Sequence, residues 1–399
     1  MKVEIEKLDN FGRGITYVDG KICFVENALP GEIVRIDIIK KTKKYLLGKI
    51  IDFYKLSDNR VIDKCFYSDV CGGCNLGHLS LDEENKFKCL KVKEILKKFG
   101  DISSELVKDT TCVNEYNYRN KITLHGKEHI LGYYKKNSNS VVNVKNCLLA
   151  HDKINKVIDV LNKISDKDNI EEALIRVSND GSEIMLSLTG KIDDYWYFKN
   201  YVDTLIVNGE VLLGEGKLIS NIGIKKYYVS ADSFFQVNKD LTKLLYDEVL
   251  RIIEVVKPKK VLDLYCGTGT IGIYISDLVD SVVGVDYSKS GIEDANKNKK
   301  LNNCTNIDFI CDKVENVIDQ FNDIDLVIVD PPRAGLDTKT IQNIKRIGSK
   351  DLVYISCDPV TLARDLKELS YIYEVVEVKP YNMFPRTYHV ESVVFLRRK

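Results

Sequence analysis

Cys357 follows an apolar run near the C-terminus, in the segment Ile355-Ser356-Cys357-Asp358-Pro359. A free thiol is only roughly a few per cent ionised near neutral pH, but its thiolate is a strong nucleophile that suits attack on an electron-poor carbon. The Ser, Asp and Pro around it indicate a loop at the carboxyl end of a strand, where the sites of open α/β sheets form. We therefore expect Cys357 to be a nucleophile, although cysteines after apolar strands also often pack in a core.

A glycine-rich segment, Val261 to Thr270, is the second feature with chemical meaning. Its apolar run leads into Gly267 and Gly269, where the missing Cβ atoms let the backbone turn sharply and approach a ligand. Asp286 ends the next apolar run, where a carboxylate can accept both ribose hydroxyls of a nucleotide-type cofactor. Because Gly272 completes a Gly-x-Gly-x-x-Gly pattern, the glycines alone leave a nicotinamide enzyme open.

Uracil is one target that needs both a thiol and a cofactor of this type. Addition of sulfur to C6 gives C5 enolate character, and C5 can then attack the positively charged methyl group of a sulfonium donor. A base must next remove the C5 proton so that the thiolate can leave. Methylation of cytosine at C5 shares this chemistry and remains an enzymatic alternative.

Four further cysteines could hold a metal centre. Cys65, Cys71 and Cys74 form a Cys-x5-Cys-Gly-Gly-Cys pattern, and Cys147 follows after a long gap. Thiolates at such spacing can wrap one centre, and the glycines allow a tight loop around it. Zinc also takes four cysteines, but structural zinc sites more often use paired Cys-x2-Cys units. An odd total of eleven cysteines argues against a disulfide framework.

Length and composition describe a multidomain protein without membrane segments. The 399 residues exceed the size at which one core stops growing, so two or three domains are expected. Lys+Arg and Asp+Glu both number 59, so net charge offers no global argument for a nucleic-acid partner. No apolar run approaches the roughly 20 residues that cross a bilayer. The N-terminus lacks the apolar stretch of a signal peptide, and we expect a cytoplasmic protein.

Turn signals and periodicity divide the chain into three parts. Residues 1–60 read as short strands of a small β-barrel. Residues 61–232 read as a mixed α+β central domain with much antiparallel sheet, and we expect its helix, residues 81–100, to pack on the C-terminal domain. Residues 233–399 alternate helical patterns with apolar strands, which predicts a doubly wound α/β sheet. The strands expected there are 261–264, 281–285, 325–329, 352–355 and 393–396.

These motifs together resemble one family, the RNA 5-methyluridine (uracil-C5) methyltransferases, over essentially the whole chain. The N-terminal part resembles a TRAM domain, an oligonucleotide/oligosaccharide-binding-like barrel. The C-terminal part resembles a class I (Rossmann-like) S-adenosylmethionine-dependent methyltransferase. The resemblance rests on Ser233-Phe234-Phe235-Gln236-Val237-Asn238, Asp263-Leu264-Tyr265-Cys266-Gly267, Asp330-Pro331-Pro332-Arg333, Ser356-Cys357-Asp358-Pro359 and His389-Val390-Glu391-Ser392.

The resemblance implies a role for each matching residue. Cys357 would be the nucleophile and Glu391 the base that takes the C5 proton. Cofactor contacts would come from Gln236, Tyr265, Asp286 and Asp330. Phe234 would stack near the RNA, and Arg119 would contact it.

The cysteine arrangement resembles the [4Fe-4S] site of the branch that modifies 23S ribosomal RNA. The family therefore implies a monomer that methylates a uridine of 23S rRNA with S-adenosylmethionine. Transfer RNA methylation at the T-loop is the alternative within the family. A non-catalytic RNA-binding or ribosome-assembly factor is the alternative outside enzymes.

Overall fold

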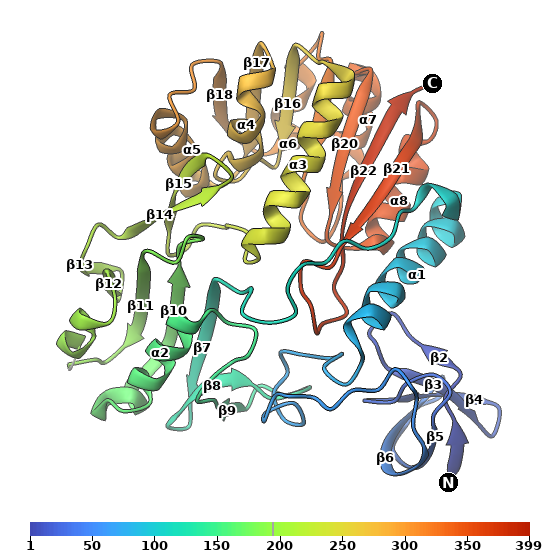
Figure 1. Ribbon diagram of the computed structural model, residues 1–399. Helices are drawn as coiled ribbons and strands as arrows, with labels where there is room; N and C mark the ends of the chain where they lie inside the picture. Colours follow the sequence, from blue (N-terminus) through green and yellow to red (C-terminus); the bar gives the residue numbers. More distant parts are fainter. Residues whose placement is uncertain (194) are drawn as a thin grey trace.

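Three large sheets follow one another along the chain in the computed structural model, which describes residues 1–193 and 195–399 (Figure 1). The N-terminal sheet and the C-terminal sheet lie at opposite ends of the molecule, and the long helix α1 runs between them. Within the described part of the chain, no helix is both long and apolar enough to cross a membrane.

The first sheet has the strand order β1-β5-β6-β4-β3-β2 and curls around its own small core. Cys23, Val25, Val34 and Ile36 are fully buried in that core. The bounds are β1 Lys2–Glu4, β2 Lys7–Leu8, β3 Gly14–Val18, β4 Lys21–Val25, β5 Ile33–Lys41 and β6 Leu46–Lys55.

Helix α1 spans Leu81–Gly100, with Ser80 before it and Asp101 closing it in a left-handed conformation. Its residues Val92, Ile95 and Leu96 are buried in the same core as the C-terminal sheet, and it packs against α8, Pro359–Leu369. Leu90, although apolar, is 55% exposed. The helix instead buries two charged side chains that find partners far along the chain.

The second sheet has the order β13-β12-β11-β10-β7-β8-β9 and is antiparallel except for the β11–β12 pair. Helix α2 covers it through Ile154, Val157 and Leu161. A separate hairpin, β14–β15, leads into the last part of the chain. The bounds are η1 Ser104–Leu106, β7 Lys121–Lys127, β8 Ile130–Tyr134, β9 Val141–Asn143, α2 Asp152–Leu161, η2 Ser165–Asn169, β10 Ile170–Val177, β11 Ile184–Gly190, η3 Tyr195–Asn200, β12 Thr204–Val207, β13 Glu210–Leu213, β14 Lys217–Ile222 and β15 Lys225–Ser230.

The third sheet has the order β18-β17-β16-β19-β20-β22-β21, parallel up to β20 and antiparallel beyond it. Each of the five expected strands is present, and β18 and β21 are additional. Helices pack on both faces, since two separate clusters of buried residues flank the sheet. The bounds are α3 Lys239–Val256, β16 Lys260–Leu264, α4 Thr270–Ile275, η4 Ser276–Leu278, β17 Ser281–Asp286, α5 Lys289–Leu301, β18 Ile307–Cys311, α6 Val314–Val317, η5 Ile318–Gln320, β19 Leu326–Val329, α7 Thr338–Ile347, β20 Asp351–Ser356, β21 Tyr373–Tyr381 and β22 Glu391–Arg398.

A buried ionic network joins α1 to the segment between β21 and β22. The Glu84 and Lys88 side chains are both 0% exposed, and Lys88 Nζ donates to Glu84 Oε1 at 2.8 Å. Asn382 Nδ2 donates to the same oxygen at 2.9 Å, and the backbone N–H of Arg386 donates to both Glu84 oxygens. One carboxylate therefore holds together residues about three hundred positions apart in sequence.

We expect Glu84→Gln to lower the free energy of unfolding by about 3–5 kcal/mol, because it leaves buried Lys88 without a full counter-charge. Urea denaturation followed by circular dichroism measures this change. Glu83→Gln is the matched control, since Glu83 pairs with Lys86 on the surface and its loss should cost under about 1 kcal/mol. Equal losses in the two variants would contradict a special role for Glu84.

Candidate active site

The register of the third sheet brings the candidate residues to one edge. Leu264 of β16 pairs with Val285 of β17 and with Val329 of β19. The residues that follow these three strand positions, Tyr265, Asp286 and Asp330, therefore emerge beside one another at the carboxyl edge of parallel strands. The order reverses at β16, so this edge is also the topological switch point where open α/β sheets bind ligands.

Cys357 and Glu391 meet at the same edge through antiparallel pairing. Ser356 of β20 is the partner of Ser392 of β22. Cys357 directly follows β20 and Glu391 is the first residue of β22. The two residues are therefore close together, and the Glu391 carboxylate raises the pKa of the Cys357 thiol. Two residues that are 34 positions apart in sequence are thus neighbours because the last strand turns back along β20.

Burial and mutual repulsion raise the pKa values of the acids in this cleft. The pKa of the Cys357 thiol is raised to about 12, mainly by burial and in addition by the carboxylates of Glu391 and Asp330, while the Arg333 guanidinium lowers it. Burial raises the pKa of Glu391 to about 8, again with Asp330 raising and Arg333 lowering it. Burial alone raises the pKa of Asp330 to about 7. In the substrate-free protein at neutral pH, the thiol and Glu391 are therefore mostly protonated.

The glycine-rich loop has the backbone conformation expected of a ligand cradle. Gly267 and Gly269 have φ of 55° and 75°, and a Cβ built on Gly267 would meet nothing within 4 Å, so the backbone there faces open space. Tyr265 also has a left-handed φ of 64°, which is strained for a non-glycine residue and is found mainly at functional sites. Asp286 accepts hydrogen bonds from the N–H groups of Gly267 and Ser288, at 2.9 and 2.8 Å, and so ties the loop to β17.

Asp263 provides an unsatisfied carboxylate oxygen below this loop. The side chain is fully buried, and its Oδ2 accepts from Gly272 N–H at 3.1 Å, while Oδ1 has no hydrogen-bond partner among the described residues. The pKa of Asp263 is raised to about 8, mainly by burial; the Gly272 hydrogen bond lowers it, and Asp330 and Asp286 raise it. A buried cluster of carboxyl groups next to a glycine cradle fits a cationic, nucleotide-type ligand, which would pair with the acids.

The segment carrying Phe234 and Gln236 crosses from the second sheet to the cleft. Asn120 donates from its side chain to the Gln236 carbonyl at 3.1 Å, and Asn238 donates from its side chain to the Met383 carbonyl. The first bond holds the backbone of Gln236, and the second connects the neighbouring Asn238 to the segment that leads to Glu391. Phe234 is 69% exposed, available for stacking on a nucleobase. Arg119 lies instead at the cavity of the four cysteines.

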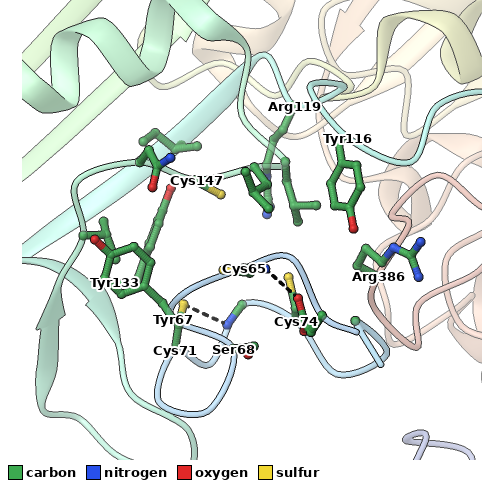
Figure 2. Close-up of a pocket in the computed structure, with 18 of the residues that line it drawn as sticks. Cys65, Tyr67, Ser68, Cys71, Cys74, Tyr116, Arg119, Tyr133, Cys147 and Arg386 are labelled. Atoms are coloured by element: carbon green, nitrogen blue, oxygen red, sulfur yellow. Dashed lines mark hydrogen bonds between the residues drawn. The ribbon is translucent and has the colours of Figure 1, made fainter. Parts of the chain in front are cut away.

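All four cysteines line one cavity of about 420 Å³. Figure 2 shows Cys65, Cys71 and Cys74 on one loop, facing Cys147 across the space, with Arg119, Tyr116 and Arg386 at its far side. Burial raises the pKa values of the Cys65, Cys71 and Cys74 thiols. In residues 1–193 and 195–399, however, no three His, Cys, Asp or Glu side chains stand close enough to hold a single metal ion. The expected iron–sulfur cluster is therefore not shown.

Arg333 and the Glu84 network are features that the sequence analysis did not assign. Arg333 stands in the Asp-Pro-Pro-Arg motif, but no sequence signal marks its guanidinium as a neighbour of Cys357 and Glu391. No sequence signal marks the Glu84 network, because its members come from α1 and from a segment near the C-terminus.

The C-terminal part has the fold of a class I S-adenosylmethionine-dependent methyltransferase. Three features define it: the doubly wound sheet, the glycine-rich loop, and the acidic residues at the carboxyl ends of the parallel strands. Residues 219–399 match the family described as tRNA (Uracil-5-)-methyltransferase, and residues 1–51 match the TRAM domain. The structure resembles that of the *Pyrococcus abyssi* tRNA (uracil-54, C5)-methyltransferase in complex with S-adenosyl-L-homocysteine. The TM-score is 0.82 and the identity 26%, over 99% of this chain and 100% of that chain.

Two curated relatives extend over nearly the full length. An uncharacterized RNA methyltransferase of *Clostridium tetani* is 33% identical, over 96% of this chain and 93% of its own length. Another, from *Clostridium acetobutylicum*, is 34% identical over 100% of this chain and 96% of its own length. The chain therefore belongs to the family of RNA uracil-5-methyltransferases. The fold class and the TRAM domain expected from sequence are confirmed, whereas the 23S rRNA branch and the individual site residues stay predictions.

We expect alkylation of Cys357 by iodoacetamide to accelerate continuously between about pH 7 and about pH 9.5, because only the thiolate reacts and a pKa far above this range gives no plateau. Arg333→Met should slow it at every pH by raising that pKa, and Arg333→Lys should retain most of the wild-type rate. Peptide mass spectrometry distinguishes Cys357 from the other cysteines. A plateau below pH 9, or equal rates in the two variants, would contradict this electrostatic account.

Proposed function

We propose that the protein transfers a methyl group from S-adenosylmethionine to C5 of a uridine in structured RNA through a covalent bond between Cys357 and C6. The observation that supports this best is the pairing of Ser356 with Ser392, which makes Cys357 and Glu391 neighbours at the cofactor edge. A nucleophile and a base must both reach one pyrimidine ring, on two adjacent carbons. Gln236, Tyr265, Asp286 and Asp330 are the proposed cofactor contacts.

The proposed steps balance without any additional reactant. The Cys357 thiolate adds to C6, and the electron pair released at C5 attacks the methyl carbon of the sulfonium, whose carbon–sulfur bond breaks to leave S-adenosylhomocysteine. Ionised Glu391 then takes the C5 proton. The C6–sulfur bond breaks as the double bond re-forms, which frees the thiolate, and Glu391 passes its proton to solvent.

The raised pKa values suit this sequence of events. A cationic cofactor next to Asp330, Glu391 and Cys357 favours the ionised forms of all three groups, so that cofactor binding activates both the nucleophile and the base. Before the cofactor binds, the thiol stays protonated and is protected from side reactions. Phe234, exposed at the entry, is the proposed stacking partner of the displaced RNA, which must present an unstacked base to this site.

We propose a [4Fe-4S] cluster as the occupant of the cysteine cavity. Four thiols surround a space of about 420 Å³. In their present positions they are too far apart to bind one ion. A cluster is larger than one ion, and its four thiolate ligands lie further apart. Arg119 Nε and Arg386 Nε, both lining this cavity, are buried without a hydrogen-bond partner among the described residues. A cluster with four thiolates carries net negative charge and sulfur acceptors that such N–H groups suit. Zinc is the alternative.

We propose 23S ribosomal RNA as the substrate and a cytoplasmic monomer as the acting form. The four-cysteine arrangement supports this branch by its resemblance, and all eleven cysteines are free, as a reducing compartment would keep them. A uridine in the transfer RNA T-loop is the second candidate, favoured by the likeness to the *Pyrococcus abyssi* tRNA enzyme. Arg119 lines the cavity and is partly exposed, so we propose it both as a partner of the cluster and as an RNA contact.

We expect Cys357→Ala to abolish covalent capture of RNA that contains 5-fluorouridine, because no sulfur can add to C6. Glu391→Gln should still transfer the methyl group but retain the adduct with ordinary uridine RNA, because the C5 proton is not removed. Denaturing gels with labelled RNA and labelled cofactor measure both events. Cys23→Ala, which removes a free cysteine in the core of the first sheet, is the control. Turnover by Cys357→Ala at the wild-type rate would reject the covalent route.

Deletion of the gene should remove 5-methyluridine from 23S rRNA and leave transfer RNA unchanged, because the proposed substrate is ribosomal. Mass spectrometry of nucleosides from the separated RNA classes measures this. Loss from transfer RNA instead would select the T-loop alternative, and loss of 5-methylcytidine would indicate the cytosine reaction. Unchanged RNA, together with failure of the purified protein to bind S-adenosylmethionine, would favour a non-catalytic RNA-binding factor.

A further inference from the structure

The segment between β21 and β22, residues 382–390, leads directly into Glu391 but is held by the first third of the chain. Lys88 Nζ donates to the Asn382 side chain and to the Phe384 carbonyl, at 2.5 and 3.2 Å. The Tyr118 hydroxyl donates to the Pro385 carbonyl at 3.0 Å, and Lys91 Nζ donates to the Tyr388 carbonyl at 2.9 Å. The position of the proposed base thus depends on residues outside its own sheet.

Arg386 is the point where this segment meets the cysteine loop. The Arg386 carbonyl accepts from the N–H groups of Asn75 and Leu76, at 2.9 and 3.0 Å, and these two residues directly follow Cys74. The Arg386 N–H donates to the Glu84 carboxylate. Both backbone polar groups of Arg386 are therefore fixed from outside, one by the cysteine loop and the other by α1.

The Arg386 side chain lines the edge of the cavity and is held there by several partners. The residue is 3% exposed, and its guanidinium donates to the Leu79 carbonyl and pairs with Glu115. It also lies over the Tyr116 ring, 5.5 Å from the ring centre. Figure 2 shows Arg386 beside Cys74 at the side of the cavity opposite Cys147. Its Nε remains without a partner among the described residues, although it is buried.

The backbone of Arg386 is strained. Its φ is 70°, in the left-handed region that costs a non-glycine residue of the order of 1–3 kcal/mol and persists only where surrounding contacts enforce it. Those contacts come from the segment that carries Cys74 and from Glu84. Loosening the cysteine loop therefore removes part of the restraint that keeps Arg386, and the chain up to Glu391, in place.

We propose that Arg386 is a positioning residue that couples occupancy of the four-cysteine cavity to the placement of Glu391. This inference rests on the proposed function, because it takes Glu391 as the base and a cluster as the occupant. With the cavity filled, the loop after Cys74 is anchored, and so is the Arg386 carbonyl that Asn75 and Leu76 of this loop bind. With the cavity empty, the segment 386–391 loosens and proton removal from C5 slows, while Cys357, on a different strand, still adds to C6.

The test compares loaded protein, defined by its iron and sulfide content, with protein emptied by a chelator and an oxidant and then reduced to regenerate its thiols. Ordinary uridine RNA and labelled S-adenosylmethionine are supplied to both. We expect the methylated adduct to accumulate in the emptied protein and its release to slow by roughly 10–100-fold, since a misplacement of about 1 Å can cost about that much. Cofactor affinity and the rate of capture of 5-fluorouridine RNA should change less than about twofold.

Hydrogen exchange gives a readout that is independent of turnover. The amides of residues 386–391 should exchange at least about tenfold faster in the emptied protein, whereas those of β20 should not change, because local opening exposes only the loosened segment. Zinc in place of iron in the purified protein would contradict the cluster. A segment that exchanges equally fast with the cavity full or empty would overturn the coupling itself.

Arg386→Lys separates coupling from a general loss of structure. It keeps a cation for Glu84 and Glu115 but loses the planar guanidinium that binds the Leu79 carbonyl and lies over the Tyr116 ring, so we expect slow adduct release that emptying the cavity no longer changes. Arg251→Gln is the control, because Arg251 binds Glu377 on β21 and touches neither the cavity nor the segment. It should retain the wild-type response.

The outcomes distinguish the two levels of the proposal. A wild-type protein that captures no 5-fluorouridine RNA would reject the covalent mechanism. A wild-type protein that captures it, but releases the methylated RNA equally fast with the cavity full or empty, would reject the coupling alone. A parallel fall of capture, cofactor affinity and release would also reject it, because that pattern indicates a general structural loss.

Discussion

The carboxylate of Glu84 is the interaction on which the geometry of the cleft depends. An ionised group with no exposed surface is costly to bury unless several donors satisfy it. Lys88, Asn382 and the Arg386 N–H together do so. Because two of these donors lie just before β22, the need to pair one buried charge fixes α1 against the C-terminal sheet and also fixes the approach of the chain to Glu391. Replacing the network by apolar side chains could preserve stability, but it would not specify where that segment sits.

A second constraint acts in the cleft, where acids are kept close together. Burial raises the pKa values of Asp263, Asp330 and Glu391 to about 8, 7 and 8. Their folded-state pKa values lie above those of the unfolded chain, so the folded protein binds more protons and loses stability as the pH rises from about 4 to about 8. A cationic ligand reverses this loss by pairing with the ionised acids. The empty site therefore lowers the stability of the folded protein, and binding of a cationic cofactor of the kind that this fold accommodates restores it.

Local patterns were sufficient to predict the chemistry-bearing loops. Apolar runs ending in Gly267, Asp286, Asp330 and Cys357 predicted both the strands and the residues at their ends, because a strand followed by a turn leaves its signal in a few consecutive positions. Strands β18 and β21 were missed. β18 contains Asp308 and β21 alternates charged with apolar residues, so neither resembles the continuous apolar run of a buried parallel strand.

The contacts that position the base could not be predicted for a different reason. Lys88 lies on the buried face of α1, where sequence periodicity favours an apolar residue, and Leu90 lies outside. Glu84, one turn earlier on the same helix, pairs with Lys88. The other partners of Lys88, Asn382 and Phe384, are almost three hundred positions away. Arg386 could not be predicted either, because no sequence pattern indicates its strained backbone or its buried Nε without a hydrogen-bond partner. Because the partners on both sides of this segment belong to different sheets, the arrangement of the whole chain, and not that of the catalytic part alone, determines where Glu391 meets Cys357.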